Sequence, residues 1–155
     1  MELAQLLPHL LPKAIAWAEG VECDVVSCGS PLDAPGVADA RTVGVEAPEA
    51  IRVALVDSLP WPVDSELRNA AIQTGFIGPD IVGLTIGHAI VIRRGHLSRR
   101  LLSHECRHVA QYEQSGSIAE FLRRYLGAIV EHGYRNCPFE QDARAHELPD
   151  SGSAL

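Results

Sequence analysis

The chain has 155 residues, of which 46% are hydrophobic, and it carries a formal net charge of -7 at pH 7. A chain of this length is normally one domain that buries a core without disulfide bonds. The acidic balance disfavours a phosphate backbone as partner, so no nucleic-acid binding is expected. No apolar run is long enough to span a bilayer, and the N-terminus has no basic leader segment. A cytoplasmic protein without a membrane partner is therefore predicted.

The N-terminal region, residues 1–50, is predicted to contain one helix followed by a loop-rich segment. Leucine, isoleucine and alanine recur at helical spacing over residues 2–19, and Gly20 is expected to end this helix. Pro8 and Pro12 lie inside the pattern and should kink or shorten it, because proline lacks the backbone N–H.

Short elements follow this helix. The valine-rich residues 21–28 are predicted to form a strand, and the Gly- and Pro-rich residues 32–50 to form a loop with one helical turn near Val37. Residues 51–57 alternate apolar and other side chains, which is typical of a strand. A helix is expected over residues 64–75, with an acidic or hydroxyl cap at its start and a glycine at its end.

The second half of the chain is predicted to be one hairpin and three helices. The apolar run at 81–93 is divided by two glycines, which indicates two short strands or one strand with a bulge. A helix is expected at 97–114 and a strongly amphipathic helix at 117–133. Pro138 is well placed as the first residue of a third helix, since its missing N–H costs nothing there.

The helix at 97–114 contains His104-Glu105-Cys106-Arg107-His108, a His-Glu-x-x-His motif. On a helix, residues four apart share one face, so two imidazoles can bind one metal ion while Glu105 lies beside it. A carboxylate in that position can accept a proton from a water that the metal has acidified. A chance match on an ordinary helix with two solvated histidines is the alternative, but the opposite face is an apolar stripe suited to burial.

Two histidines supply only two ligands, whereas a catalytic zinc site takes three from the protein and leaves one position for water. The metzincin pattern is excluded, because Gln stands at both 111 and 114 where that pattern needs Gly and His. Glu140 differs from the other downstream acids, since it lies in the first turn of the helix that begins at Pro138. The candidates for the third ligand are Glu113, Glu120, Glu131, His132, Glu140, Asp142 and Glu147.

With these residues in view, the chain resembles the gluzincin metallopeptidases, and among them small bacterial zinc-dependent peptidases with a His-Glu-x-x-His-x-x-Gln motif. The matching segments are residues 83–92, 101–112 and 136–143, so that the resemblance covers about residues 80–147.

The resemblance implies that His104, His108 and Glu140 bind Zn²⁺ and that Glu105 is the general base. It also implies that residues 83–92 include the edge strand along which such enzymes lay an extended peptide. The stretch 83–92 is therefore expected to be an exposed edge, and a proline at Ile90 to impair turnover more than zinc binding.

The resemblance does not define which residues orient the two ligand histidines. Many gluzincins have an aspartate four residues after the ligand glutamate, and here that position is Arg144. The partner of each histidine's second nitrogen is therefore unassigned. Replacing Glu131 or Glu147 is expected to leave the metal content unchanged.

Several residues near the motif have more than one interpretation. The oxyanion that develops during peptide hydrolysis needs a donor, and Tyr134, His132 and Arg144 are candidates because they lie near the third ligand in sequence. Tyr134 is preferred among these three, although a tyrosine in such a position more often closes its loop onto the hydrophobic core. Gln111 either touches substrate or caps the site, and His88 is expected to be structural or exposed rather than a ligand.

These observations predict one α+β, zincin-like domain over residues 1–155, with a small mixed β-sheet packed against an active-site helix and further helices. The predicted function is zinc-dependent hydrolysis of peptide bonds, in which Glu105 and Tyr134 are catalytic. Three alternatives stay open: a non-catalytic zinc-binding module, a hydrolase of non-peptide amides, and a metal-free helical protein. The oligomeric state is not predicted.

Overall fold

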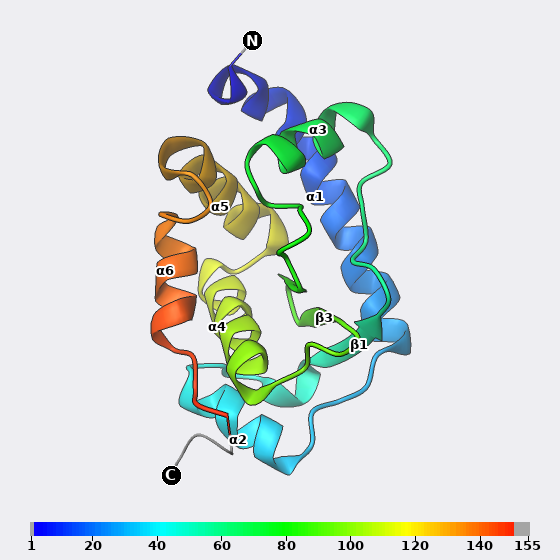
Figure 1. Ribbon diagram of the computed structural model, residues 1–155, viewed down its shortest axis with the longest axis vertical. Coiled ribbons are helices and arrows are strands. Elements are labelled where there is room, and N and C mark those ends of the chain that lie inside the picture. The colour runs from blue at the N-terminus through cyan, green and yellow to red at the C-terminus, as the bar shows by residue number, and fades with distance from the viewer. Residues whose placement is uncertain (1, 151–155) are drawn as a thin grey trace.

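The computed structural model describes residues 2–150, which form an α+β domain with six α-helices and one small mixed sheet (Figure 1). The elements are α1 (Leu3–Cys28), α2 (Ala34–Thr42), the short 3₁₀ helix η1 (Pro48–Ala50), β1 (Arg52–Val56), α3 (Ser65–Gln73), β2 (Gly83–Ile86), β3 (Ala89–Arg93), α4 (Arg99–Ser115), α5 (Ile118–His132) and α6 (Pro138–Ala145). Among these residues no helix combines the length and the apolar character needed to cross a membrane.

The sheet has three strands in the order β1-β3-β2, with β1 parallel and β2 antiparallel to the central β3. The β2–β3 hairpin closes through a two-residue turn whose first member, Gly87, has a φ of 61° that only glycine adopts readily. The predicted division of this run is therefore confirmed as two short strands. The outer edge of β1 is bridged at Val53 by Ser30, whereas β2 is the opposite edge of the sheet.

The register determines which backbone groups of β2 face outward. Arg93 donates its N–H to the carbonyl of Val82, so this pair and every second pair beyond it exchange hydrogen bonds. Leu84 belongs to that bonded set. Gly83 and Thr85 belong to the alternate pairs, which do not exchange hydrogen bonds with β3. Their N–H and C=O groups therefore point away from β3 toward the free edge of β2.

The expectation that the whole stretch 83–92 is an exposed edge is wrong for its second half. Ile90 lies on the central strand β3 and is completely buried, with neighbours on both sides. A proline there would break the ladder in the middle of the sheet, so it would test folding rather than substrate pairing. Within residues 83–92, only β2 lies at an edge of the sheet.

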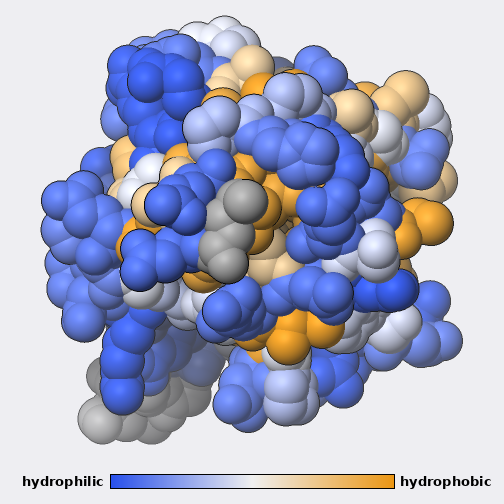
Figure 2. Space-filling model, turned by 90° about the horizontal axis from the view of Figure 1, so that it is seen from above, coloured by the Kyte–Doolittle hydropathy of each residue, from blue (hydrophilic) through white to orange (hydrophobic). Residues whose placement is uncertain are grey.

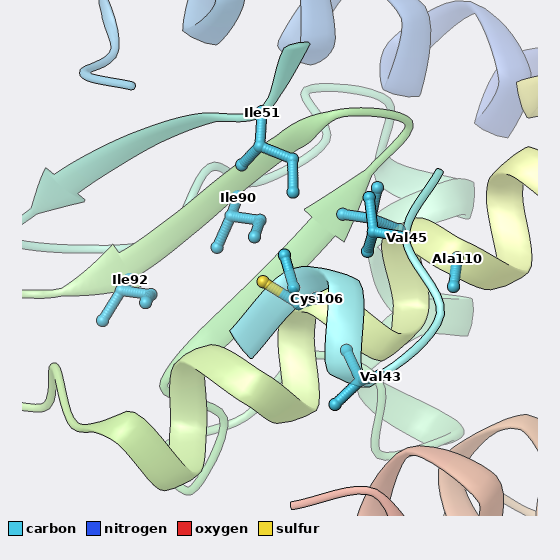
Figure 3. Packing of buried hydrophobic residues seen from close by; sticks show 9 residues of the cluster. Val43, Val45, Ile51, Ile90, Ile92, Cys106 and Ala110 are labelled. Carbon is cyan, nitrogen blue, oxygen red and sulfur yellow. The ribbon is translucent and has the colours of Figure 1, made fainter. Parts of the chain in front are cut away.

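Helices cover both faces of the sheet. On one face, Ile90 and Ile92 of β3 pack against Cys106 and Val109 of α4, together with the residues that follow α2 (Figure 3). On the other face, Val91 packs against the C-terminal half of α1. The apolar back of α4 is thus fixed in the core, which leaves its histidine face directed toward α5 and α6.

Helix α1 is longer than predicted. The prediction of a strand at residues 21–28 is wrong, because these residues continue the helix. The helix runs through Pro8, Pro12 and Gly20 to Cys28. Val21 and Val25 continue the helical stripe and pack on the sheet, and this burial outweighs the weak strand preference of valine. Gly20 is exposed, and a Cβ atom added there would meet no neighbour within 4 Å. The helix continues through this residue without a break.

The remaining elements follow the sequence more closely. The segment predicted as a loop with one helical turn contains the nine-residue helix α2, which begins at the cap Asp33, whose side chain accepts from the N–H of Gly36. The strand β1 and helix α3 lie where they were expected, with Asp64 capping α3. The prediction of an α+β domain with a small mixed sheet is confirmed.

Candidate metal centre

Three candidate ligands converge at one point between α4 and α6. Ligand atoms of His104, His108 and Glu140 all lie within 4.8 Å of one another. The Nε2 atom of His104 is 3.3 Å from one carboxylate oxygen of Glu140, and the Nε2 atom of His108 is 3.0 Å from the other. All three side chains are almost fully enclosed, with 12%, 9% and 3% of their surfaces exposed.

Helix α4 positions the two imidazoles. Ser98 caps the helix by accepting the N–H of Leu101, and Gly116 ends it in the left-handed conformation. Within the helix, His104 and His108 are one turn apart, and their ring centroids are separated by 5.0 Å. The third residue comes from the first turn of α6, which begins at Pro138 as predicted.

The second ring nitrogen of His108 is held by Gln111. Its Nδ1 atom lies 2.8 Å from the Gln111 side-chain oxygen. The amide nitrogen of Gln111 donates to the carbonyl of Phe139 and to Asp142, so the amide oxygen is the atom that faces the imidazole. Since an amide oxygen only accepts, His108 donates from Nδ1, and its Nε2 faces Glu140. Arg107 in turn binds Asp142 and completes this chain of polar contacts.

The second ring nitrogen of His104 is held by Glu147. Its Nδ1 atom lies 2.8 Å from a Glu147 carboxylate oxygen, and the other oxygen accepts from Arg100. A carboxylate on Nδ1 fixes the tautomer that turns Nε2 toward the site. Glu147, which was not expected to take part in metal binding, therefore contacts one of the candidate ligands directly. Glu147 lies just after α6, and its role depends on the folded chain rather than on a motif.

Glu140 has a third partner, which no motif in the sequence singled out. The buried hydroxyl of Tyr125 on α5 donates to Glu140 over 2.6 Å. Tyr125 belongs to the apolar stripe of α5 and stacks on Phe121. The available signal was that this member of the stripe carries a hydroxyl, which needs a partner when it is buried.

Glu105 lies beside the three ligands without belonging to their cluster. One oxygen of its carboxylate accepts from the hydroxyl of Thr85 on β2 over 2.8 Å. A Cβ atom added at Gly83 would come within 2.9 Å of the other oxygen, so the backbone of β2 closely approaches this carboxylate. Glu105 is 5% exposed. Its side chain is therefore held between the histidine-bearing face of α4 and the face of β2 that Gly83 and Thr85 share.

The charges in the cluster stabilise one another. Burial tends to lower the pKa of His108, but the hydrogen bond to Glu140 and the nearby carboxylates outweigh it and raise that pKa to about 9. The pKa of His104 is raised by the same balance. Burial would raise the pKa of Glu140, but its bonds to the two histidines hold it well below its usual range. These shifts reflect pairing between the ionised Glu140 carboxylate and imidazoles that favour their protonated form, and a metal ion that bound here would replace the protons on the two Nε2 atoms.

The candidate oxyanion donors lie in different surroundings. Tyr134 is half-buried in the loop before α6, and it lines the same cavity as Glu105 and Glu140. Its ring also packs edge-on against Phe76, with centroids 6.5 Å apart. Burial and the charge of Glu140 raise its pKa, so the phenol stays protonated. His132 is exposed next to Glu131, and Arg144 is exposed and donates to the carbonyl of Arg135.

Two other candidate ligands, Glu113 and Glu120, are engaged away from the cluster. Glu113 accepts the N–H groups of Glu46 and Ala47 and binds His88, whose Nε2 lies 2.9 Å away. Glu120 is paired with Arg123 and Arg124 at the surface. All four cysteines are free thiols; Cys106 is buried in the core, and burial raises its pKa to about 12.

The residues present fit a divalent metal ion. Two imidazole nitrogens and one carboxylate oxygen face each other, and each imidazole has its second nitrogen fixed by a hydrogen bond from the opposite side of the ring. This donor set is one that zinc accepts, and related sites also bind other first-row metals. The arrangement can therefore hold a cation beside the carboxylate of Glu105.

No family model, no curated protein sequence and no solved structure matches this chain.

Proposed function

We propose that this protein is a zinc-dependent metallopeptidase of the gluzincin type, in which His104, His108 and Glu140 bind the metal. The observation that supports this most is the position of Glu105, a buried carboxylate beside the ligand cluster that accepts a hydrogen bond from the hydroxyl of Thr85. A purely structural metal site has no need for such a group, because four ligands would close it.

A bound zinc would supply Lewis acidity, polarising a carbonyl group and bringing the pKa of water toward about 7. Glu105 is the group that accepts the proton from the attacking water, and it later delivers that proton to the leaving amine. The hydrogen bond from Thr85 leaves the other oxygen of Glu105 available for this transfer.

The free edge of β2 is suited to present the substrate. The outward N–H and C=O groups of Gly83 and Thr85 can pair with an extended peptide, which then runs past the carboxylate of Glu105. Peptide addition at a sheet edge satisfies the backbone of both partners. The scissile carbonyl would thereby approach the metal in a fixed orientation.

Tyr134 is the proposed donor to the oxyanion. It lines the cavity together with Glu105 and Glu140, and its phenol is protonated at neutral pH because burial raises its pKa. A neutral donor beside the metal stabilises charge that develops only in the transition state.

The experiment compares wild type and Glu105→Gln for cleavage of an unfolded-protein digest, with zinc measured in both samples by mass spectrometry. The glutamine keeps the shape but cannot accept a proton, so turnover should fall about 10²- to 10⁴-fold while one zinc per chain is retained. Equal cleavage by both proteins excludes Glu105 as the base. Zinc in both proteins without cleavage of any peptide favours a non-catalytic zinc-binding module, and cleavage of other amides alone favours a non-peptide hydrolase.

A further inference from the structure

An apolar cavity of ≈ 110 Å³ opens directly onto the metal centre. Its floor is formed by Glu105, His108 and Glu140, and one wall by the backbone and side chains of β2. The remaining walls come from α5 and from α1 and α3, of which the last two are far from the motif in sequence. The cavity is therefore continuous with the proposed catalytic site and with the strand edge proposed to hold the substrate.

The walls away from the metal are built from aliphatic and small side chains. Leu10, Ala14 and Trp17 contribute one helical stripe of α1, and Leu67 and Ala71 contribute from α3. The hydroxyl of Thr74, on the same wall, already donates to the carbonyl of Ala71. Seen from above, apolar side chains gather in a recess surrounded by hydrophilic ones (Figure 2). A charged group that entered here would lose its hydration without gaining a partner on these walls.

The size of the cavity limits its occupant. An engineered cavity of about 150 Å³ with similar aliphatic and aromatic walls binds one benzene molecule. A space of ≈ 110 Å³ that is open on one side accepts one branched aliphatic side chain or one aromatic ring. It does not accept an extended peptide segment, whose backbone polar groups would be buried without hydrogen bonds.

We propose that this cavity is the specificity pocket of the enzyme and that it receives one large uncharged apolar side chain, of the leucine or phenylalanine kind, next to the scissile bond. The inference rests on the proposed peptidase function. A peptide paired with the free edge of β2 has every second side chain on one face, and that spacing brings one side chain into the cavity while the neighbouring carbonyl stays at Glu105.

The test uses zinc-loaded protein and a peptide series that differs at one position, with glycine, alanine, leucine, phenylalanine, lysine or glutamate. Leucine and phenylalanine should give kcat/KM values about 10- to 100-fold above alanine, and lysine and glutamate should fall below alanine. Binding of the same peptides to Glu105→Gln, measured by calorimetry, should follow the same order without turnover.

Substitutions that fill the cavity in steps test whether the cavity causes the preference for apolar side chains. Ala71 lines the cavity on α3 but is only partly buried, so Ala71→Leu and then Ala71→Phe should fill it without displacing the core. Each step should reduce the preference for leucine over alanine, until Ala71→Phe removes most of it. Ala38→Phe, on the exposed surface of α2, is the matched control and should leave the preference unchanged. Thermal unfolding of each variant verifies that it is folded.

The outcomes separate the two proposals. Cleavage without preference for apolar side chains, or a preference that survives Ala71→Phe in folded protein, overturns the specificity pocket and leaves the peptidase intact. Binding to Glu105→Gln in the expected order without cleavage by wild type keeps the pocket and overturns the peptidase. If no peptide is bound or cleaved, the pocket proposal is also wrong.

Discussion

The Nδ1 atom of His104 lies 2.8 Å from a carboxylate oxygen of Glu147, 43 positions further along the chain. Loss of such a partner usually costs about 10- to 100-fold in metal affinity, because the imidazole is no longer oriented. Glu147→Ala should therefore weaken zinc binding by that factor in a competition assay with a chromophoric chelator. Glu140→Ala should lose far more, and the exposed Glu131→Ala should lose nothing. Equal affinities of Glu147→Ala and Glu131→Ala would remove Glu147 from the site.

Gly83 should be intolerant of even a methyl group. A Cβ atom there would lie 2.9 Å from the carboxylate of Glu105, which Thr85 holds in place. Gly83→Ala should displace that carboxylate and lower kcat about 10- to 100-fold, in line with the effect of small misplacements. The free energy of unfolding should change by less than about 1 kcal/mol. Gly78→Ala is the matched control, because a Cβ atom there meets no neighbour within 4 Å.

Replacing each of two tyrosines of the cavity by phenylalanine should affect different steps, one turnover and the other zinc binding. Tyr134→Phe removes the proposed oxyanion donor, so kcat should fall by about 10²- to 10³-fold with full zinc content. Tyr125→Phe removes the hydroxyl that binds Glu140, so zinc affinity should fall instead. Measuring kcat per bound zinc for both variants distinguishes the two effects. An unchanged kcat in Tyr134→Phe would assign that residue to packing against Phe76 alone.

Glu113 should make the stability depend on pH. Burial would raise its pKa, but bonds from the N–H groups of Glu46 and Ala47 and from His88 outweigh it and lower that pKa. A lowered folded-state pKa contributes stability that is present above the unfolded-state value of 4.5 and is lost as the pH falls through the folded-state value. Glu113→Gln should cost about 1–3 kcal/mol at pH 7, and this difference should shrink below pH 4.5. Chemical denaturation at several pH values, with Glu131→Gln as control, measures it.

Gly20 should be replaceable with a gain in stability. It lies inside α1, is exposed, and a Cβ atom there would meet nothing within 4 Å. Because glycine in a helix interior is destabilising, Gly20→Ala should raise the free energy of unfolding by about 0.5–1 kcal/mol. Urea denaturation measures the gain. A loss of stability would mean that the helix bends or ends near this residue in solution.

Gly20 also illustrates which parts of the fold were predictable. Sequence patterns located α3 to α6 and the β2–β3 hairpin, because caps, glycines and apolar periodicity agree there. At residues 20–28 they disagree: a glycine and several valines suggest a break and a strand, although the spacing of Val21 and Val25 continues a helix. Contact with the sheet decides between them, and no local pattern contains that information.

For the candidate site, the sequence predicted the ligand residues but not their hydrogen-bond partners. Residues in a motif or in a helix start, such as His104, His108 and Glu140, could be selected from the sequence, and the structure brings them together. The partners that orient them could not, because Glu147 and Tyr125 reach the cluster only through the packing of α4, α5 and the end of α6. The position of Ile90 was missed because a short apolar run does not reveal which of its strands is central.

The cavity joins two distant parts of the chain. Residues that face the metal position and their hydrogen-bond partners lie between 104 and 147, whereas one wall of the cavity belongs to the first twenty residues. Leu10 and Ala14 belong to that wall, whereas the candidate ligands His108 and Glu140 lie at the floor of the same cavity. In the proposed peptidase, selectivity and chemistry could therefore change independently during evolution. Exchanging the N-terminal helix would be a way to direct such an enzyme toward other side chains while its reactive groups stay in place.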